Sequence, residues 1–335
     1  MKIAIHPVKE SFSERWIDYC EKERIHWKKV NCYNNDIIKQ LGDCDALLWH
    51  FSHNDPKAIL IARPLIYSLE KAGKKVFPNF HTVWHFDDKL GQKYLLESIN
   101  APLVPTWVFY DKNQALEWAE STDFPKVFKL RRGAASQNVR LIKNKKSAFK
   151  FIRKAFRKGF PAYDPVESLK ERWRKYKLGT ENLEEIAQGF ARFVVPPPYS
   201  TIIGRERGYI YFQKYIPGND HDIRVVVIGE KAFAIKRMVR NNDFRASGSG
   251  KILYSHNLFK DSTIRLSFYL AEKLGSQCVA FDFLQDNGSP LLTEISYGFS
   301  PGGYDRCTGY WDKNMTWHEG TFNPYGWMID DLLKA

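Results

Sequence analysis

The segment CVAFDFLQDNGSPLLTEIS spans residues 278–296. It is typical of a β-strand, a tight DNGS turn and a second strand. With the turn centred on Gly288, Asp282 and Glu294 lie opposite each other, and Leu284 and Leu292 complete the same face. Phe281 and Phe283 point to the other face and fill a core. The pattern predicts a β-hairpin on which two carboxylates are paired.

Directly opposed carboxylates need a compensating charge. Like charges opposite each other destabilise a hairpin, so replacing one of them is expected to stabilise the metal-free protein. A divalent cation between the two groups would remove the repulsion. Mg²⁺ suits the position because it prefers oxygen ligands and shares them with substrate phosphates. The alternative is a pair of solvated acids on an open face.

Length and composition indicate a protein of two or three domains. The chain has 335 residues, with 44% hydrophobic, 15% aromatic and 27% charged residues. No run of 18 apolar residues predicts a transmembrane helix, and the start MKIAIHPVKESF lacks the features of a secretory signal. Five cysteines without a CxxC motif are expected to be reduced thiols of a cytoplasmic protein.

The net charge of +13 calls for an anionic partner. Much of it lies in KNKKSAFKFIRKAFRKGF (143–160) and SLKERWRKYKLG (168–179). No RRM, KH, zinc-finger or helix-turn-helix signature accompanies these segments, so nucleic acid is not expected as a partner. The charge favours an anionic small molecule or glycan as substrate.

The order of expected elements divides the chain into parts. Residues 1–80 alternate short strands and helices, which predicts a doubly wound parallel α/β unit without a GxGxxG motif. Residues 83–145 combine helices with strands, and 147–200 are basic and helical. Antiparallel strands dominate from residue 209, and 297–326 are rich in Tyr, Trp, Gly and Pro.

Cationic side chains beside small-residue loops are candidates for binding phosphate. Lys129 ends a strand just before GAASQN (133–138), where backbone N–H groups and a point charge can meet one anion. Asp222 and Arg224 share one face of a strand. Arg245 lies among small residues in DFRASGSGK. The alternatives are a surface lysine before a turn and arginines that neutralise neighbouring aspartates.

This ordered set of features resembles the ATP-grasp superfamily, in particular its branch related to the ligases that add glutamate to ribosomal protein tails. The resemblance covers nearly the whole chain. It implies an α/β and α+β protein, an ATP-grasp fold with an N-terminal doubly wound pre-ATP-grasp domain over 1–82. A central subdomain over 83–208 would carry a basic helical insertion at about 147–200, and a C-terminal subdomain would span 209–335.

The resemblance also implies roles for individual residues, with ATP and one or two Mg²⁺ ions as cofactors. The nucleotide site would be formed by Lys89, Lys129 and the loop residue Ser136 at the phosphates, by Lys214, Tyr215 and Ile216 at adenine, and by Asp222 at the ribose. Arg224 would bind the transferring phosphate, and Arg245 would stabilise an acyl phosphate and the tetrahedral intermediate. The metal ligands would be Asp282, Glu294 and Ser296.

Two departures from the family pattern stand out. Ser296 occupies a position where the family usually has Asn, and a hydroxyl is a weaker ligand for a second metal ion. The loop GAASQN has one glycine where relatives have several. These departures keep open a nucleotide-binding regulatory protein without catalytic activity.

The aromatic extension suggests a sugar substrate. Trp311, Trp317 and His318 resemble a platform that stacks on a pyranose ring and binds its hydroxyls; the alternative is an aromatic core. The segments 147–200 and 297–326 are expected to shape the substrate site. Similarity to ATP-grasp proteins linked to surface polysaccharides implies an amide formed between a uronic acid or glycan precursor and an amino acid or amine, with peripheral contact to a lipid-linked substrate. A ligase acting on a peptide, protein tail or small metabolite is the alternative, and the sequence leaves the oligomeric state open.

Overall fold

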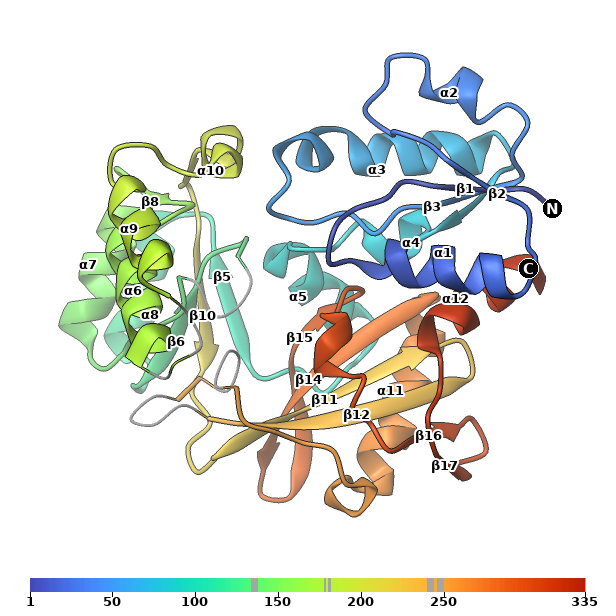
Figure 1. The fold of residues 1–335 in the computed structure, drawn as a ribbon. Helices are drawn as coiled ribbons and strands as arrows, with labels where there is room; N and C mark the ends of the chain where they lie inside the picture. The colour runs from blue at the N-terminus through green and yellow to red at the C-terminus, as the bar shows by residue number, and fades with distance from the viewer. Residues whose placement is uncertain (134–137, 178, 180–181, 240–243, 246–249, 335) are drawn as a thin grey trace.

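The described residues form three large β-sheets and one two-stranded sheet (Figure 1). The computed structural model describes residues 1–334 apart from 134–137, 178, 180–181, 240–243 and 246–249. Figure 1 shows the N-terminal sheet above the C-terminal sheet, with the central sheet beside both. No helix in the described ranges is long and apolar enough to cross a membrane.

The N-terminal part is a doubly wound parallel sheet, as predicted. Its strands run in the order β2-β1-β3-β4: β1 (Ile3–Ile5), β2 (Trp27–Lys29), β3 (Ala46–Leu48) and β4 (Lys75–Phe77). The helices are α1 (Phe12–Lys22), α2 (Ile37–Gln40), α3 (Pro56–Lys71) and α4 (Phe80–Val83). Ile3 and Ile5 pack with α1, whereas Ala4 between them packs with α3. The helices therefore cover both faces, which is why the inner strands β1 and β3 are apolar throughout.

The central part is an antiparallel sheet in the order β5-β10-β6-β7. Its strands are β5 (Thr106–Phe109), β6 (Lys126–Lys129), β7 (Arg140–Ile142) and β10 (Ile210–Lys214). Helices α6 (Lys112–Ser121) and α7 (Lys145–Ala155) contribute buried alanines to its core. Strand β10 lies in the middle of this sheet, although the predicted C-terminal subdomain begins at residue 209. Helix α7 likewise belongs to the central core, so the basic region is not a uniform insertion.

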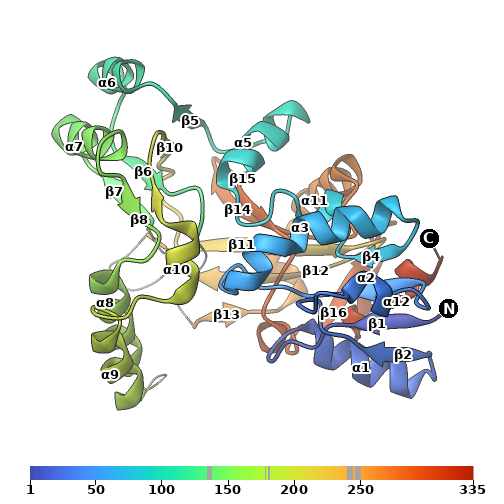
Figure 2. The same ribbon diagram turned by 90° about the horizontal axis from the view of Figure 1, so that it is seen from above.

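A helical excursion connects the two halves of the central sheet. It contains β8 (Phe160–Pro161), α8 (Pro165–Lys177), α9 (Leu183–Ala191), α10 (Pro198–Ile203) and β9 (Arg205–Glu206). Strands β8 and β9 pair with each other and close the base of the excursion. Figure 2 shows α8 and α9 at the end of the molecule opposite the N-terminal sheet, with α10 lying between them and the other parts.

The C-terminal part is a larger sheet in the order β15-β14-β11-β12-β16-β17, with β13 paired to β12. The strands are β11 (His221–Ile228), β12 (Lys231–Met238), β13 (Ile252–Leu253), β14 (Cys278–Asp286), β15 (Ser289–Ser296), β16 (Gly309–Asp312) and β17 (Trp317–Glu319). Two short 3-10 helices span His256–Leu258 and Pro301–Gly303. The sheet is sandwiched between two layers of other elements.

Each face of the C-terminal sheet has its own cover. Helices α11 (Asp261–Leu274) and α5 (Lys89–Ser98) pack on one face, together with Phe281 and Phe283. The N-terminal sheet, α1 and the last helix α12 (Pro324–Lys334) pack on the other. Helix α5 thus belongs to the C-terminal core although it was predicted to open the central subdomain. The chain's last helix likewise returns to the N-terminal part.

Candidate active site

A cavity of about 650 Å³ opens where the three parts meet. It is lined by all the nucleotide, metal and catalytic residues named above that the structure describes: Lys89, Lys129, Lys214, Tyr215, Ile216, Asp222, Arg224, Arg245, Asp282, Glu294 and Ser296. Ser136 lies outside the described residues. The predicted set is therefore brought together from segments that are far apart in the sequence.

The charged floor of the cavity is the uncovered half of one sheet face. Along β11, Val226 and Ile228 are buried under the N-terminal sheet, and Arg224 on the same face lines the cavity. Along β14, Ala280 is covered in the same way and Asp282 lines the cavity. Side chains of one strand alternate between faces, so a change from apolar to charged residues at every second position marks where the cover ends.

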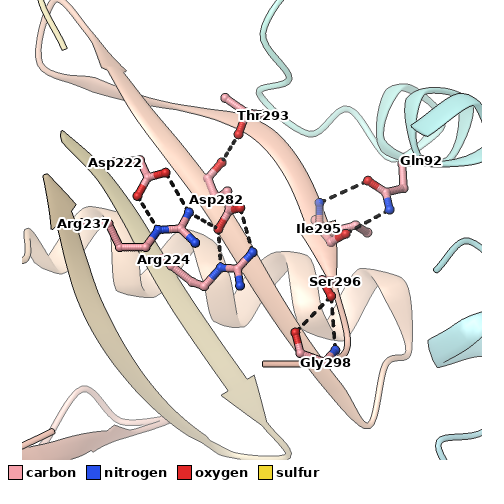
Figure 3. Close-up of polar contacts among 9 residues, drawn as sticks. All are labelled: Gln92, Asp222, Arg224, Arg237, Asp282, Thr293, Ile295, Ser296 and Gly298. Carbon is pink, nitrogen blue, oxygen red and sulfur yellow. Dashed lines mark hydrogen bonds and ion pairs between the residues drawn. The ribbon is translucent and has the colours of Figure 1, made fainter. Parts of the chain in front are cut away.

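The carboxylate hairpin forms with a register that differs from the predicted one (Figure 3). Asn287 and Gly288 form a two-residue turn with φ of 50° and 82°, and Asp286 pairs with Ser289. Continued without a break, this ladder would place Thr293 opposite Asp282. A bulge at Thr293, whose Oγ1 donates to the Asp282 carbonyl at 3.0 Å, brings Glu294 there instead.

The bulge changes which leucines share a face. Leu284 pairs with Leu291, and Leu292 packs with Phe283 in the core. The prediction that Leu284 and Leu292 complete the carboxylate face is therefore wrong, whereas the pairing of Asp282 with Glu294 is confirmed. The bulged residue adds one position to β15 and so reverses the alternation beyond it.

Arginine guanidinium groups compensate the aspartates of the floor (Figure 3). Arg224 binds Asp282 through two nitrogens, with Nη2 at 2.8 Å from Oδ2. Arg237 binds Asp222 at 2.7 Å and reaches Asp282 at 3.1 Å. Burial raises the pKa of Asp282, but the two arginines outweigh burial and lower the pKa to about 2. Burial also raises the pKa of Asp222, against the attraction of Arg237.

Glu294 is compensated by a different cation. Its Oε1 lies 3.2 Å from Nζ of Lys89, which also donates to the Gly133 carbonyl at 2.8 Å. Burial lowers the pKa of Lys89, but Glu294 and Asp87 outweigh burial and leave it raised. Each carboxylate of the hairpin therefore has its own positive partner. These ion pairs argue against the expectation that replacing one carboxylate stabilises the metal-free protein.

The start of helix α5 holds the root of the small-residue loop. Asp88 caps the helix and binds Arg131, with its Oδ1 at 2.9 Å from Nε. Asp87, at a φ of 54°, accepts from the Gly133 N–H at 2.7 Å. The Lys89 N–H donates to the Arg131 carbonyl. These contacts place Gly133 at the cavity wall next to both lysines.

Lys129 is a buried cation of this site: it is 8% exposed, and its ammonium group makes no hydrogen bond or ion pair with any residue in the described ranges. Its backbone pairs with Tyr211 of β10. Burial lowers its pKa to about 8, because the attraction of Glu294 only partly offsets the loss of water. A buried ammonium that lines a cavity and lacks a counter-ion is a binding point for an anion.

Solved structures of known proteins share this architecture. The RimK domain protein ATP-grasp from Sphaerobacter thermophilus matches with a TM-score of 0.59 and 14% identity, over 99% of each chain. D-alanine–D-alanine ligase from Bacillus anthracis, complexed with ATP, matches with a TM-score of 0.57 and 13% identity, over 100% of this chain and 96% of that one. The ATP-grasp ligase PsnB, complexed with a minimal precursor, Mg and ADP, gives 0.55 and 10%, over 99% and 97%.

This chain has the ATP-grasp fold. The likeness extends over whole chains, so it includes the N-terminal sheet as well as the two sheets that enclose the cavity. The sequence itself matches no protein-family model and no curated protein.

The floor of this ATP-grasp cavity offers suitable ligands for Mg²⁺. Asp282 and Glu294 present carboxylate oxygens, and the Ser296 hydroxyl is bonded to the backbone of Gly298. In the described ranges no three His, Cys, Asp or Glu side chains form a metal cluster. An ion held here would therefore need further oxygens from a bound phosphate, which is the usual arrangement for Mg²⁺. Without a metal ion, Arg224 and Lys89 supply the positive charge beside the two carboxylates.

The predicted sugar-platform residues lie away from the cavity, although Gly298, Phe299 and Ser300 at the start of the aromatic segment 297–326 line it. Trp311 is 5% exposed and packs with Phe259 in the core under α11, so the prediction that it forms a sugar platform is wrong. Trp317 stacks on His256, and His318 pairs with Asp312. These side chains lie on β16 and β17, at the sheet edge opposite the carboxylate hairpin. They build the end of the sheet.

The basic helical region does not shape the main cavity either. None of its described residues lines that cavity. Tyr199 and Ile203 of α10, together with Ala162 and Glu206, line a much smaller space beside His53 and Asp87. The reason is that α7 packs on the outer side of the central sheet and α8 and α9 continue outward from it.

Replacing Trp311 by Ala is expected to lower the free energy of unfolding by about 3 kcal/mol, because a large buried ring leaves a cavity. Trp173→Ala is a matched control, since this tryptophan is 49% exposed and should change stability by less than about 0.5 kcal/mol. Urea denaturation measures both. Equal losses in the two variants would show that Trp311 does not serve the core.

Three contributors to the site were missed in the sequence. Arg237 lies on β12 directly opposite Asp222, and it continues the face of Phe233 and Ile235. The same change from apolar to charged residues would have identified it. Gln92 of α5 uses its side-chain amide to pair with both the N–H and the carbonyl of Ile295, which fixes the free edge of β15 beside Glu294 (Figure 3). His50 also lines the cavity.

Proposed function

We propose that the protein is an ATP-dependent carboxylate–amine ligase that works through an acyl phosphate. The observation that carries this proposal is the buried, unpaired Lys129 beside the Arg224–Asp282 and Lys89–Glu294 pairs in one cavity. Such a cavity holds cations ready for phosphates and carboxylates suited to Mg²⁺. The ATP-grasp fold, and the ATP, ADP and Mg bound in structures similar to this one, support the same proposal.

The proposed reaction has two steps. A carboxylate oxygen of the first substrate attacks the γ-phosphorus of ATP, the bond to the bridging oxygen breaks, and ADP leaves. The amine then attacks the carbonyl carbon of the acyl phosphate, phosphate leaves, and the amine loses a proton. Both steps move negative charge between oxygens, so catalysis consists mainly of positioning and charge neutralisation.

Each cation of the cavity has a part in this scheme. Lys89 and Lys129 hold the phosphates from the central side, and Arg224 faces the phosphate that moves. Arg245, which also lines the cavity, stabilises charge on the acyl oxygen. When bound, Mg²⁺ at Asp282 and Glu294 supplies further charge neutralisation. Lys214, Tyr215 and Ile216 lie between the central and C-terminal sheets, where a planar base can be held, and Asp222 adjoins them.

Replacing Lys129 by Met is expected to weaken ATP binding and at the same time to raise the free energy of unfolding. The gain is about 1 kcal/mol or more, because the variant no longer buries an unpaired charge. A folded-state pKa of about 8 lies below the ordinary value of 10.5, so the charged form destabilises the protein fully below about pH 8. The difference between variant and wild type should therefore shrink as the pH rises towards 10.5.

Urea denaturation over this pH range measures the effect, and calorimetric titration with ATP measures the binding. The exposed Lys273→Met is the control and should show neither change. A Lys129→Met variant that is less stable than wild type at neutral pH would contradict the assignment of Lys129 as an uncompensated cation.

The second half of the cavity lies against the N-terminal sheet and suits the acceptor substrate. His50 accepts the Phe12 N–H at Nδ1, 3.1 Å away, and its ring stacks on Phe12 at 3.7 Å. Burial lowers the pKa of His50 to about 3, so the ring is neutral. Because Nδ1 accepts, the proton is on Nε2. His50 thus offers a neutral donor to a substrate oxygen beside Gly298 and Ser300.

Replacing Gly298 by Ala tests this half of the cavity. The added Cβ would stand 3.1 Å from His50 Nε2 and block the donor. We expect the Michaelis constant for the acceptor to rise about tenfold, the value of one hydrogen bond, with unchanged ATP affinity. Gly302→Ala is the matched control, since no atom lies within 4 Å of its added Cβ. Steady-state kinetics on both variants decide, and equal kinetics would contradict the placement of the acceptor.

The nature of the two substrates is the finer part of the proposal. A uronic acid or glycan precursor joined to an amino acid or amine, as in surface polysaccharide synthesis, remains our first candidate because the cavity has a surplus of cations. It no longer has the support of an aromatic platform. A peptide, protein tail or small metabolite fits the same cations and is the second candidate.

Release of ADP in the presence of candidate carboxylates and amines tests the proposed function. A ligase releases ADP only when both are present, and mass spectrometry of the product then separates a glycan from a peptide or metabolite. A regulatory nucleotide-binding protein would bind ATP with no such dependence on a carboxylate and an amine. That result would overturn the ligase assignment.

A further inference from the structure

One region of the surface is unusually apolar. More than half of the large apolar side chains that are exposed in the described ranges lie between residues 166 and 202. The two most exposed of them are Val194 at 83% and Leu183 at 64%. A patch of exposed apolar side chains indicates a surface that binds another protein or a membrane.

Five of these side chains lie in the hairpin of helices α8 and α9, and three more follow α9 directly at 193–195. Helix α8 has no buried residue, and α9 buries only Ile186 and Gly189. A Cβ on Gly189 would stand 2.9 Å from a methyl group of Leu169, so the two helices are packed closely on each other. No residue of the hairpin belongs to any of the hydrophobic cores. The hairpin therefore projects with its apolar residues outward instead of adding to the fold.

A strongly basic helix accompanies the hairpin. The segment 143–160 carries only Lys and Arg as charged residues, and all of them are exposed. Helix α7 buries Ala148, Ile152 and Ala155 against the central sheet, which leaves its basic side facing solvent. Figures 1 and 2 both place α7, α8 and α9 at the end of the molecule farthest from the N-terminal sheet. We call this end, residues 143–158 together with α8 and α9, the distal flank.

We propose that the distal flank docks on an anionic lipid surface. Aromatic and aliphatic side chains of α8 and α9 would enter the interface, while the lysines and arginines of α7 contact the head groups. Basic side chains beside Trp and Phe are the combination that binds such surfaces. A second copy of this chain is disfavoured as the cover, because two flanks of the same strong positive charge repel each other. The proposal does not depend on the ligase assignment.

Cosedimentation of the full chain with lipid vesicles tests the charge requirement. We expect binding to vesicles of phosphatidylcholine mixed with phosphatidylglycerol, weak binding to phosphatidylcholine alone, and loss of binding at high salt. Combined Lys146→Glu, Lys150→Glu and Arg153→Glu should lower the partition coefficient by about a hundredfold. Lys39→Glu with Lys71→Glu, on exposed sites of the N-terminal part, should leave it near wild type.

The apolar requirement needs its own variants. Trp173→Ser with Phe190→Ser should weaken vesicle binding and keep the melting temperature, since both side chains are about half exposed or more. Leu60→Ser with Tyr67→Ser, equally exposed on α3, is the control. Absence of binding to anionic vesicles, or equal binding of all variants, would overturn the proposal. So would an oligomer in light scattering that only the Trp173 and Phe190 changes dissociate, because a second copy would then cover the flank.

Discussion

Replacing Asp282 by Ala is expected to lower the free energy of unfolding by about 3–5 kcal/mol and to abolish ATP turnover. The loss of stability arises because Arg224 would keep its buried charge without a carboxylate partner. Loss of turnover follows because the hairpin would keep only one of its two carboxylates for Mg²⁺, that of Glu294. Urea denaturation and ADP release measure the two effects. Asp286→Ala, on the same strand and away from the arginines, is the control.

The pH dependence of this effect has a definite sign. The pKa of Asp282 is lowered from 3.8 to about 2, so its contribution to stability is complete above about pH 4. It is lost as the pH falls towards 2, and the difference between wild type and Asp282→Ala should shrink over that range. A variant that is more stable than wild type at neutral pH would mean that repulsion from Glu294 outweighs the attraction of the arginines.

Replacing Arg224 by Ala is expected to lower kcat by about 10²–10³ and to leave ATP affinity nearly unchanged. A guanidinium that acts on the moving phosphate contributes most in the transition state. Asp282 would still be bound by Arg237 at 3.1 Å, so the floor of the cavity should keep its shape. Arg265→Ala, exposed on α11, is the control.

Single-turnover kinetics and calorimetric titration separate the two effects of Arg224. If Arg224→Ala loses ATP affinity and turns over the remaining bound ATP at the normal rate, Arg224 is a binding residue only. Arg224→Lys should recover part of the rate, because it restores the charge but not the two-nitrogen contact with Asp282.

The local sequence of the hairpin was sufficient to predict that Asp282 and Glu294 are paired, but not the register of the whole hairpin. Asn287 and Gly288 predict a turn, and the alternation around Phe281 and Phe283 predicts the core face. The bulge at Thr293 could not be predicted, because it depends on a hydrogen bond to the neighbouring strand. The predicted turn was centred on Gly288, which shifts the register by one residue. The bulge shifts it by the same amount, so the predicted pair was correct although the bulge was not foreseen.

Long-range packing explains the remaining differences. Arg237 is not one of them, because β11 and β12 are consecutive strands and the change from Phe233 and Ile235 to Arg237 on one face is visible in the sequence. Helix α5 packs on β15 because Gln92 pairs with Ile295, a contact between residues more than two hundred positions apart. Trp311 has the composition of a sugar platform, and only its position under Phe259 identifies it as core.

Calorimetric titration with a non-hydrolysable ATP analogue shows whether this cavity is the nucleotide site, and it requires no knowledge of the substrates. We expect wild type to bind one analogue per chain in the presence of Mg²⁺ and to bind it more weakly after chelation. Lys129→Met should bind the analogue much more weakly in both conditions. Absence of binding to wild type, or binding that depends on neither Mg²⁺ nor Lys129, would contradict the assignment of this cavity as the nucleotide site.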